Sequence, residues 1–350
     1  MLQVRIPLAE HGLPMIHSFQ VTKRYIILVV CSLRVEPHLI GSKLFVLMEP
    51  FAGVQTLGWR GDQNTTVFVM DIESTDPEAE PVRTFSIDPM FMNHHINAWE
   101  DEASGEVTMD VVAYKDGSFL SNPRGFGNLE VMRSHEERAA LKALRPTIRR
   151  YTLDMNLDAD PTTSGSDGNA PLWASWVPFE LSLDRRHSTP AEEWPTAPGL
   201  PAALGPLHME MPRFNEVKHG SPYRYVYGVG SPDSSPTHVS GLVKIDLGQP
   251  DAEAINSRGA VNAPCLSWYR QSHYPSEPIF VPRPGATEED DGVVLSVMLD
   301  GALAKSYLLV LNATTMQTIA TAYSPVVMPA DFHGEWFPEE EEEEEKRQGW

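Results

Sequence analysis

The stretch Phe91–Asp101, FMNHHINAWED, contains two adjacent histidines followed by an acidic pair. As a β-strand, it would present neighbouring side chains to opposite faces. His94 and His95 should therefore not both bind one metal ion. One is expected to face a functional site and the other to face away from it, and the sequence by itself leaves open which is which.

Bulk composition narrows the class of protein. The 350 residues can form one large domain or two ordinary ones. The formal net charge of −21 argues against nucleic acid as a partner, because phosphate binding needs clustered Lys and Arg. Part of this charge is the run Glu339–Glu345, which predicts an acidic, disordered tail over residues 338–350.

Cysteine usage and hydropathy bear on the cellular compartment. Cys31 and Cys265 are too few for a disulfide framework and are expected to be reduced, buried thiols in a cytosol-like compartment. No stretch reaches the roughly 18 apolar residues of a membrane span, and no signal peptide is recognisable. We expect a cytoplasmic protein.

Short β-rich runs separated by Gly, Pro, Asn and Asp turns dominate the chain, and its thirty prolines fit a helical bundle poorly. The expected strands are Tyr25–Val30, Lys43–Met48, Thr66–Ile72, Val82–Ile87, Glu106–Tyr114, Ile148–Met155, Tyr223–Val229, Leu242–Leu247, Val293–Leu299, Tyr307–Asn312 and Thr318–Tyr323. This pattern predicts an all-β fold, which leaves a sandwich, a barrel or a propeller. At roughly 40–50 residues a blade, a propeller would have about six or seven blades, but no clear repeat selects it.

One short helix and two surface insertions interrupt the predicted strands. Ser134–Arg145 has the S-x-x-E spacing of a capping box and a modest apolar stripe. Asp158–Asn169 and Asp184–Pro206 are rich in Pro, Ser, Gly and Asp, which is typical of surface loops.

The twelve histidines show no H-E-x-x-H spacing, and the chain has no Cys-x-x-Cys. A propeller offers a different route to a metal site. Its inner strands converge on one axis, so ligands that are far apart in sequence can meet without any local spacing signature.

FMNHHINAWED resembles the iron-binding segment of the carotenoid cleavage oxygenases, in which a His stands three residues before the Asn of an N-A-W/Y-E stretch. Here that His is His94. Further resemblances to the family are the S-E-P-x-F and E-D-D-G block within Ser276–Gly301, the closing segment Ser306–Phe337, and YRYVYGVG at Tyr223–Gly230. The resemblance extends from about His17 to Phe337 and implies a seven-bladed β-propeller of the carotenoid oxygenase type.

Carried over position by position, the resemblance implies Fe(2+) bound by His17, His94 and His333. It also implies outer glutamates at Glu210 and Glu277, which accept hydrogen bonds from the ligand rings. The alternatives are a surface glutamate at 210 and a buried structural glutamate at 277.

The family uses four histidines and three glutamates, and nothing in MLQVRIPLAEHGLP resembles the surroundings of the first ligand. We therefore expect residues 1–337 to form an incomplete propeller with its N-terminal blades missing. The implied activity is that of a carotenoid dioxygenase, an oxidoreductase that cleaves a carbon–carbon double bond of a carotenoid or apocarotenoid with dioxygen. This activity is expected to be impaired in the chain as given. Lipid substrates add an expectation of peripheral membrane contact.

Three other interpretations remain. A non-catalytic propeller could bind lipids or apocarotenoids, and the related retinoid isomerase shares the iron site without using dioxygen. A zinc hydrolase using His94, His95 and Glu100 is the third, and strand alternation argues against it.

Overall fold

The computed structural model describes residues 13–36, 57–73, 83–121, 145–156, 172–183, 208–231, 241–248, 261–328 and 333–337. Several sequence predictions lie outside these residues. They are the strand Lys43–Met48, nearly all of the helix Ser134–Arg145, both insertions and the acidic tail at 338–350.

The N-terminal part of the described chain contains two antiparallel meanders and a small sheet. The first meander consists of β2 (Gln20–Val21), β3 (Tyr25–Val30), β6 (Thr65–Asp71) and β7 (Arg83–Ile87), with β11 (Leu172–Trp173) parallel to β7. The second consists of β8 (Phe91–Asp101), β9 (Glu106–Tyr114), β10 (Thr147–Asp154) and β12 (Ser175–Leu183). The small sheet is formed by β1 (Leu13–Pro14), β4 (Leu33–Val35) and β5 (Leu57–Trp59).

The C-terminal part contains two more meanders. The third consists of β13 (His208–Phe214), β14 (Tyr225–Ser231), β15 (Gly241–Asp246) and β16 (Val261–Tyr269). In the fourth, β17 (His273–Pro275) and β18 (Ile279–Pro282) both pair with β19 (Gly292–Asp300), which is followed by β20 (Lys305–Asn312) and β21 (Thr318–Tyr323). The described helices are α3 (Ser118–Ser121) and the 3-10 turn η5 (Glu216–Lys218). None of the described helices is long and apolar enough to cross a bilayer.

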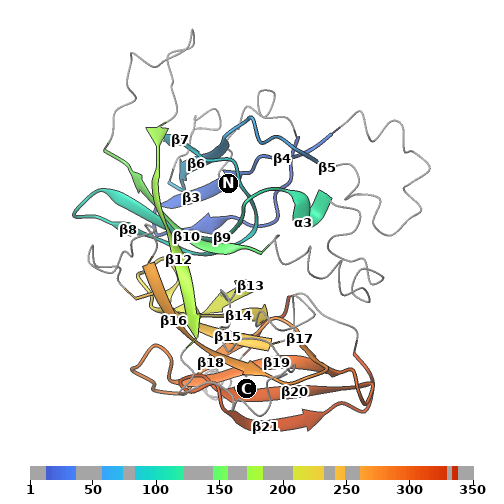
Figure 1. Cartoon of the computed structure of the whole chain (residues 1–350). Helices are drawn as coiled ribbons and strands as arrows, with labels where there is room; N and C mark the ends of the chain where they lie inside the picture. The colour runs from blue at the N-terminus through green and yellow to red at the C-terminus, as the bar shows by residue number, and fades with distance from the viewer. Residues whose placement is uncertain are drawn as a thin grey trace, which may run out of the picture.

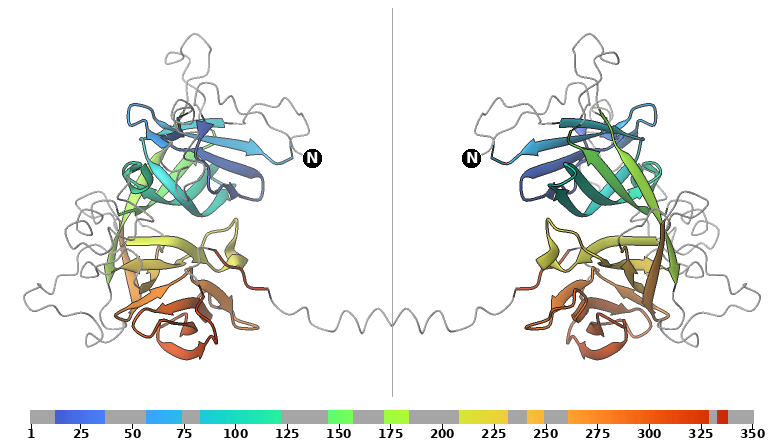
Figure 2. Two further views of the ribbon diagram at one scale, coloured as in Figure 1. Left: turned by 90° about the vertical axis from the view of Figure 1, so that its right-hand side faces the viewer. Right: turned by 90° about the vertical axis from the view of Figure 1, so that its left-hand side faces the viewer.

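Successive meanders pack face to face as the blades of a β-propeller do (Figures 1 and 2). β12 links the two halves, because its first residues pair antiparallel with β10 and its last residues pair parallel with β16. The apolar cores lie between neighbouring meanders. One joins Val67 and Phe85 to Met109 and Tyr151, and another joins β14 and β15 to β19 and β20. The all-β fold predicted from the strand pattern is confirmed, and so is the propeller that the family resemblance implies.

The strand predictions hold where the apolar pattern is uninterrupted. β3, β9 and β21 have the predicted bounds, and the other described predictions are offset by one or two residues. Three long strands were not predicted, namely β12, β13 and β16. Each contains an internal proline, at Pro178, Pro212 and Pro264 respectively. Proline removes a ladder donor and therefore weakens a strand assignment made from sequence.

A buried polar cluster joins the two halves of the described chain. The Asp110 carboxylate, which has no exposed surface, receives two hydrogen bonds from the Arg150 guanidinium at 2.8 and 2.7 Å. The Tyr223 hydroxyl of the C-terminal half donates to the same carboxylate at 2.8 Å. Arg150 also lies over the Trp99 ring, 5.0 Å from its centroid. These contacts fix how β8–β10 face the third meander.

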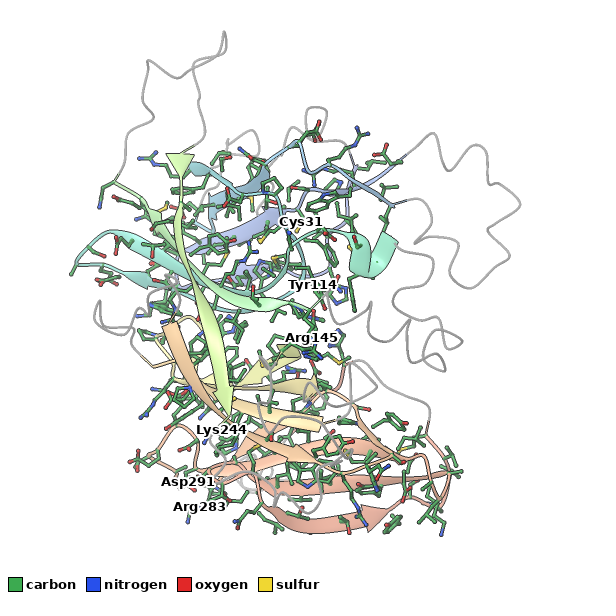
Figure 3. The ribbon with its side chains drawn as sticks, in the orientation of Figure 1. Cys31, Tyr114, Arg145, Lys244, Arg283 and Asp291 are labelled. Atoms are coloured by element: carbon green, nitrogen blue, oxygen red, sulfur yellow. The ribbon has the colours of Figure 1, made fainter. Side chains whose placement is uncertain are left out.

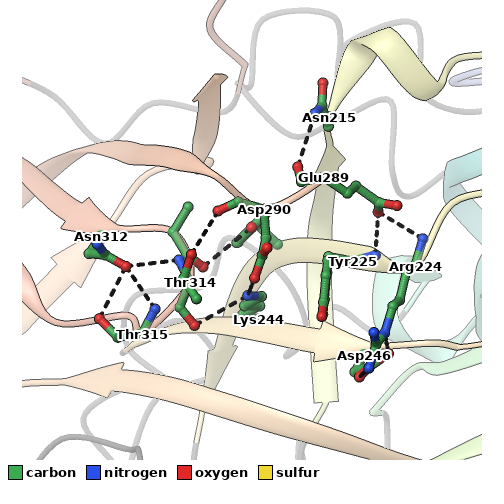
Figure 4. A network of polar contacts seen from close by, with 12 residues as sticks. Asn215, Arg224, Tyr225, Lys244, Asp246, Glu289, Asp290, Asn312, Thr314 and Thr315 are labelled. Atoms are coloured by element: carbon green, nitrogen blue, oxygen red, sulfur yellow. Dashed lines mark hydrogen bonds and ion pairs between the residues drawn. The ribbon is translucent and has the colours of Figure 1, made fainter. Parts of the chain in front are cut away.

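The E-D-D-G motif ties three strands together, as Figure 4 shows. Glu289 accepts hydrogen bonds from the backbone N–H groups of Arg224 and Tyr225 at 2.7 and 2.6 Å. The Asp290 carboxylate pairs with the ammonium of Lys244 on β15. Lys244 also donates to the Thr314 carbonyl at 3.3 Å in the turn after β20. The motif thus anchors the loop before β19 to the third meander and, through Lys244, to the turn after β20.

The two aspartates of this motif form ion pairs that differ in burial. Lys244 and Asp290 have side chains only 5% and 13% exposed, and burial lowers the pKa of Lys244 although Asp290 opposes the shift. Asp291 instead pairs with Arg283, whose side chain is 68% exposed. Figure 3 labels Lys244, Asp291 and Arg283, all in the C-terminal half.

We predict that Asp290→Asn lowers the free energy of unfolding by about 3 kcal/mol, because it leaves the buried Lys244 ammonium without its counter-charge. The neighbouring Asp291→Asn should cost less than about 1 kcal/mol, because the pair it breaks is solvated. Urea unfolding of both variants beside the unmodified chain is the measurement. Equal losses in the two variants would contradict the assignment.

Candidate metal centre

The five residues proposed for the metal site come from the inner edges of successive meanders. His17 lies three residues before β2, and His94 lies on β8. Glu210 lies on β13, and Glu277 lies between β17 and β18. His333 belongs to the segment 333–337, where Gly334 passes beside Ile279 of β18. The residues therefore come from different parts of the chain, and the packing of the meanders brings all five together.

The three histidines face one point. Nε2 of His333 lies 3.3 Å from Nε2 of His17 and 3.4 Å from Nε2 of His94. One ligand nitrogen from each ring lies within 4.8 Å of the other two. Two nitrogens that are each about 2.1 Å from one ion can be at most about 4.2 Å apart, and both of the shorter separations satisfy this limit.

Glu210 holds the far side of the His94 ring. Its carboxylate accepts a hydrogen bond from Nδ1 of His94 at 2.6 Å, from the Tyr114 hydroxyl at 2.6 Å and from the Met211 backbone N–H at 2.9 Å. Burial and the Glu210 carboxylate raise the pKa of the Tyr114 phenol well above its usual value, so Tyr114 remains a donor. Figure 3 labels Tyr114 in the N-terminal half of the molecule.

Glu277 holds the His333 ring in the same way. It accepts from Nδ1 of His333 at 3.0 Å and from the Gly334 backbone N–H at 3.1 Å. Its side chain is 5% exposed and also pairs with Arg213 at 3.1 Å. Each of the two glutamates thus contacts one of the three histidines, as expected of outer partners, and their role in metal binding remains a prediction.

This arrangement fits a metal cation better than it fits metal-free imidazoles. A carboxylate at Nδ1 fixes the Nδ1–H tautomer, which leaves the Nε2 lone pair bare. In these tautomers, the Nε2 atoms of His94 and His333, which lie 3.4 Å apart, would both be acceptors. Burial, followed by His94 and His333, lowers the pKa of His17, which favours its neutral form as well. Converging neutral imidazoles suit a divalent transition metal.

His95 points away from this point, which confirms that the two adjacent histidines separate. Its Nδ1 lies 2.8 Å from the Ser18 hydroxyl, and that hydroxyl donates to the Asn93 carbonyl at 2.6 Å. Burial is the main cause that lowers the pKa of His95, to about 3, with His94 as the second cause. His95 therefore stays neutral and braces the residue next to His17.

The rest of the FMNHHINAWED stretch secures β8. Asn97 donates to the carbonyls of Lys218 and Ser221, both at 3.0 Å. Glu100 accepts from the Arg24 backbone N–H at 2.8 Å and from the Thr22 hydroxyl. With His95 and Glu100 both engaged elsewhere, the zinc hydrolase interpretation is wrong.

Sequence reasoning did not identify three residues that shape the site. They are Ser18, Tyr114 and Arg213. Tyr114 and Arg213 directly contact Glu210 and Glu277 respectively. Ser18 contacts His95, the neighbour of His94. Only Ser18 had a local signal, because it directly follows His17 in the sequence.

Fold and site together define a β-propeller protein with a candidate three-histidine metal centre. The sequence profile of the family described as "Retinal pigment epithelial membrane protein" matches residues 2–338, so the chain belongs to this family, which includes the carotenoid oxygenases. The resemblance inferred from the motifs is thereby confirmed.

The similar curated proteins are carotenoid-cleaving enzymes. The chain is 28% identical to the beta,beta-carotene 15,15'-dioxygenase of Rattus norvegicus, over 92% of this chain and 50% of that protein. It is 31% identical to the torulene dioxygenase of Fusarium fujikuroi, over 73% of this chain and 39% of that protein. The chain thus spans about half the length of the curated relatives it matches, or less.

Solved structures support the fold. Cobalt-substituted Synechocystis ACO, an apocarotenoid oxygenase, superimposes with a TM-score of 0.58 at 20% identity, covering 93% of this chain and 53% of that one. A chimera of that oxygenase gives a TM-score of 0.59 at 21% identity, covering 92% and 52%. At this identity, the likeness establishes the propeller fold.

We predict that His94 and His333 are Nδ1–H tautomers in the metal-free chain, opposite to the Nε2–H form that free histidine prefers in water, because Glu210 and Glu277 accept at Nδ1. Nitrogen-15 NMR of histidine-labelled protein reads the tautomer directly. Glu210→Ala should return His94 to a mixture while leaving His333 unchanged. A wild-type Nε2–H signal at both rings would contradict the geometry.

Proposed function

We propose that His17, His94 and His333 bind one ferrous ion, with Glu210 and Glu277 as their outer partners. The observation that carries this proposal is the convergence of the three ring nitrogens, with carboxylates holding the opposite side of two rings. Imidazole ligands alone would also suit zinc, copper or nickel. The likeness of FMNHHINAWED to an iron-binding segment favours iron.

We further propose that the protein cleaves a carbon–carbon double bond of a carotenoid or apocarotenoid with dioxygen, giving aldehyde or ketone products. The names of the dioxygenases from rat and Fusarium support this substrate class. When bound, ferrous iron would supply the position at which dioxygen is activated beside the double bond. The polyene substrate needs no acid or base from the protein in this scheme.

The chain's own contribution is to hold and orient the ligands. Glu210 and Glu277 keep a proton at Nδ1 of His94 and His333, which fixes the ring planes and directs the opposite nitrogens to one point. They also place negative charge one step outside a shell of neutral ligands. Hydrogen bonds from the Tyr114 hydroxyl and the Met211 N–H hold the Glu210 carboxylate in this orientation.

Solvent access sets the expected activity of the chain. His17 and His333 are exposed, whereas His94 is partly buried. The described residues therefore do not form a dry enclosure around the three nitrogens, and an apolar enclosure is what registers a polyene substrate. We propose that iron binding and turnover are weak for these 350 residues. A cytoplasmic location with peripheral membrane contact remains a prediction.

Metal titration tests the proposed centre. We predict that the purified chain binds one Co²⁺ or Fe²⁺ under anaerobic conditions, and cobalt is the convenient optical probe because the Synechocystis oxygenase has been studied in cobalt-substituted form. His94→Ala should weaken binding at least 10- to 100-fold, the loss expected for an outer partner alone. His219→Ala, which removes an exposed histidine outside the cluster, is the matched control. Binding that His94→Ala and His333→Ala leave unchanged would contradict the site.

Turnover tests the reaction. We predict slow, chelator-sensitive formation of aldehyde or ketone from an apocarotenoid in the presence of dioxygen, because the ligands are exposed to water. Product analysis by liquid chromatography and mass spectrometry is the measurement. Robust cleavage with stoichiometric iron would contradict the weak-turnover proposal. Polyene binding that is indifferent to chelators would support a non-catalytic binder, and oxygen-independent ester cleavage would support an isomerohydrolase.

A further inference from the structure

The Arg213 guanidinium contacts Glu277 and several groups around it. One guanidinium nitrogen, Nη2, lies 3.1 Å from Glu277 Oε2 and donates to the Gly334 carbonyl. The other terminal nitrogen, Nη1, lies 3.5 Å from the carboxylate of Glu335 and 3.6 Å from that of Glu216. Arg213 thus contacts both the outer glutamate of His333 and the backbone directly after His333.

An irregularity in β13 directs Arg213 toward this position. Glu210 and Arg213 are three residues apart, so on a regular strand their side chains would face opposite sides. The pairing of β13 with β14 shifts register between these two residues, and Met211 between them has a φ of 50°. Pro212 needs no ladder partner there. A bulge of this kind re-aims side chains, and here it lets one strand serve both His94, through Glu210, and His333, through Arg213.

Among the described residues, the segment that carries His333 is held mainly by Glu277 and Arg213. Residues 333–337 form no strand, and Trp336 and Phe337 are 48% and 81% exposed. Glu277 accepts hydrogen bonds from the His333 ring and the Gly334 N–H, and Arg213 donates one to the Gly334 carbonyl. Glu277 and Arg213 are in turn bonded to each other, so the four groups form one connected network.

We propose that Arg213 is a positioning residue for the candidate metal ligand His333. It holds the Glu277 carboxylate and the Gly334 carbonyl at the same time, and so fixes both the ring and the backbone of this ligand. This inference rests on the proposed metal centre and deepens it. Arg213 does not face the three converging nitrogens and would act only through Glu277 and segment 333–337.

The test compares Arg213→Met and Arg213→Lys in the full 350-residue chain. Arg283→Met is the matched control, because Arg283 also pairs with a carboxylate through its guanidinium, on the loop after β18. The first readout is hydrogen–deuterium exchange of residues 333–337 in metal-free protein. We expect Arg213→Met to speed their exchange about tenfold or more, and Arg283→Met to leave it within about twofold.

The second readout is the Co²⁺ dissociation constant from optical titration. We expect Arg213→Met to raise it about 10- to 100-fold, which is the range for the loss of an outer partner. Arg213→Lys, which keeps the charge but not the planar fork, should fall between Arg213→Met and the unmodified chain. Arg283→Met should match the unmodified chain.

Three outcomes would overturn the proposal. One is wild-type exchange and wild-type Co²⁺ affinity in Arg213→Met. Another is faster exchange spread evenly over all peptides, which would make Arg213 a general stability residue. The third is full restoration of affinity by Arg213→Lys, which would make its charge alone sufficient. If the unmodified chain binds no Co²⁺, the metal centre fails, while the exchange data still decide whether Arg213 holds the segment.

Discussion

The site depends on two carboxylate–imidazole hydrogen bonds. Glu210 and Glu277 each accept from Nδ1 of one histidine, and this fixes where the opposite lone pair points. Two such lone pairs and a third histidine then meet at one point. In their Nδ1–H tautomers, His94 and His333 present two facing Nε2 acceptors at 3.4 Å, which is electrostatically unfavourable without a cation. The surrounding structure must therefore be rigid enough to hold them there.

That rigidity comes from contacts between sheets. The Asp110–Arg150–Tyr223 cluster sets the angle between the second and third meanders, and it is buried enough that an unpaired partner would be costly. The Glu289 and Asp290 contacts do the same between the third and fourth meanders. The ligands are carried by these sheets, so the positions of the three nitrogens follow from how the sheets pack. The bulge in β13 also contributes, because it lets Glu210 contact His94 while Arg213 on the same strand contacts Glu277, the partner of His333.

Strands with an unbroken apolar or alternating pattern could be predicted from sequence. For β3, β9 and β21, the predicted bounds equal those in the structure. β12, β13 and β16 could not, because an internal proline counts against a strand locally while neighbouring strands and a bulge accommodate it in the fold. The same limit applies to the site. Family motifs pointed to His17, His94 and His333, whereas Tyr114 and Arg213 have no motif of their own and act through partners about 60 to over 100 residues away.

The sequence by itself determined the all-β character, the family and the separation of His94 from His95, since alternation along a strand is a property of the local backbone. Only the tertiary structure decided which histidine faces the site. His95 is held by Ser18, in the loop before β2, and His94 is held by Glu210 on β13, so both partners are distant in sequence. The direction of a side chain relative to a distant residue is set by sheet packing, which local sequence does not encode.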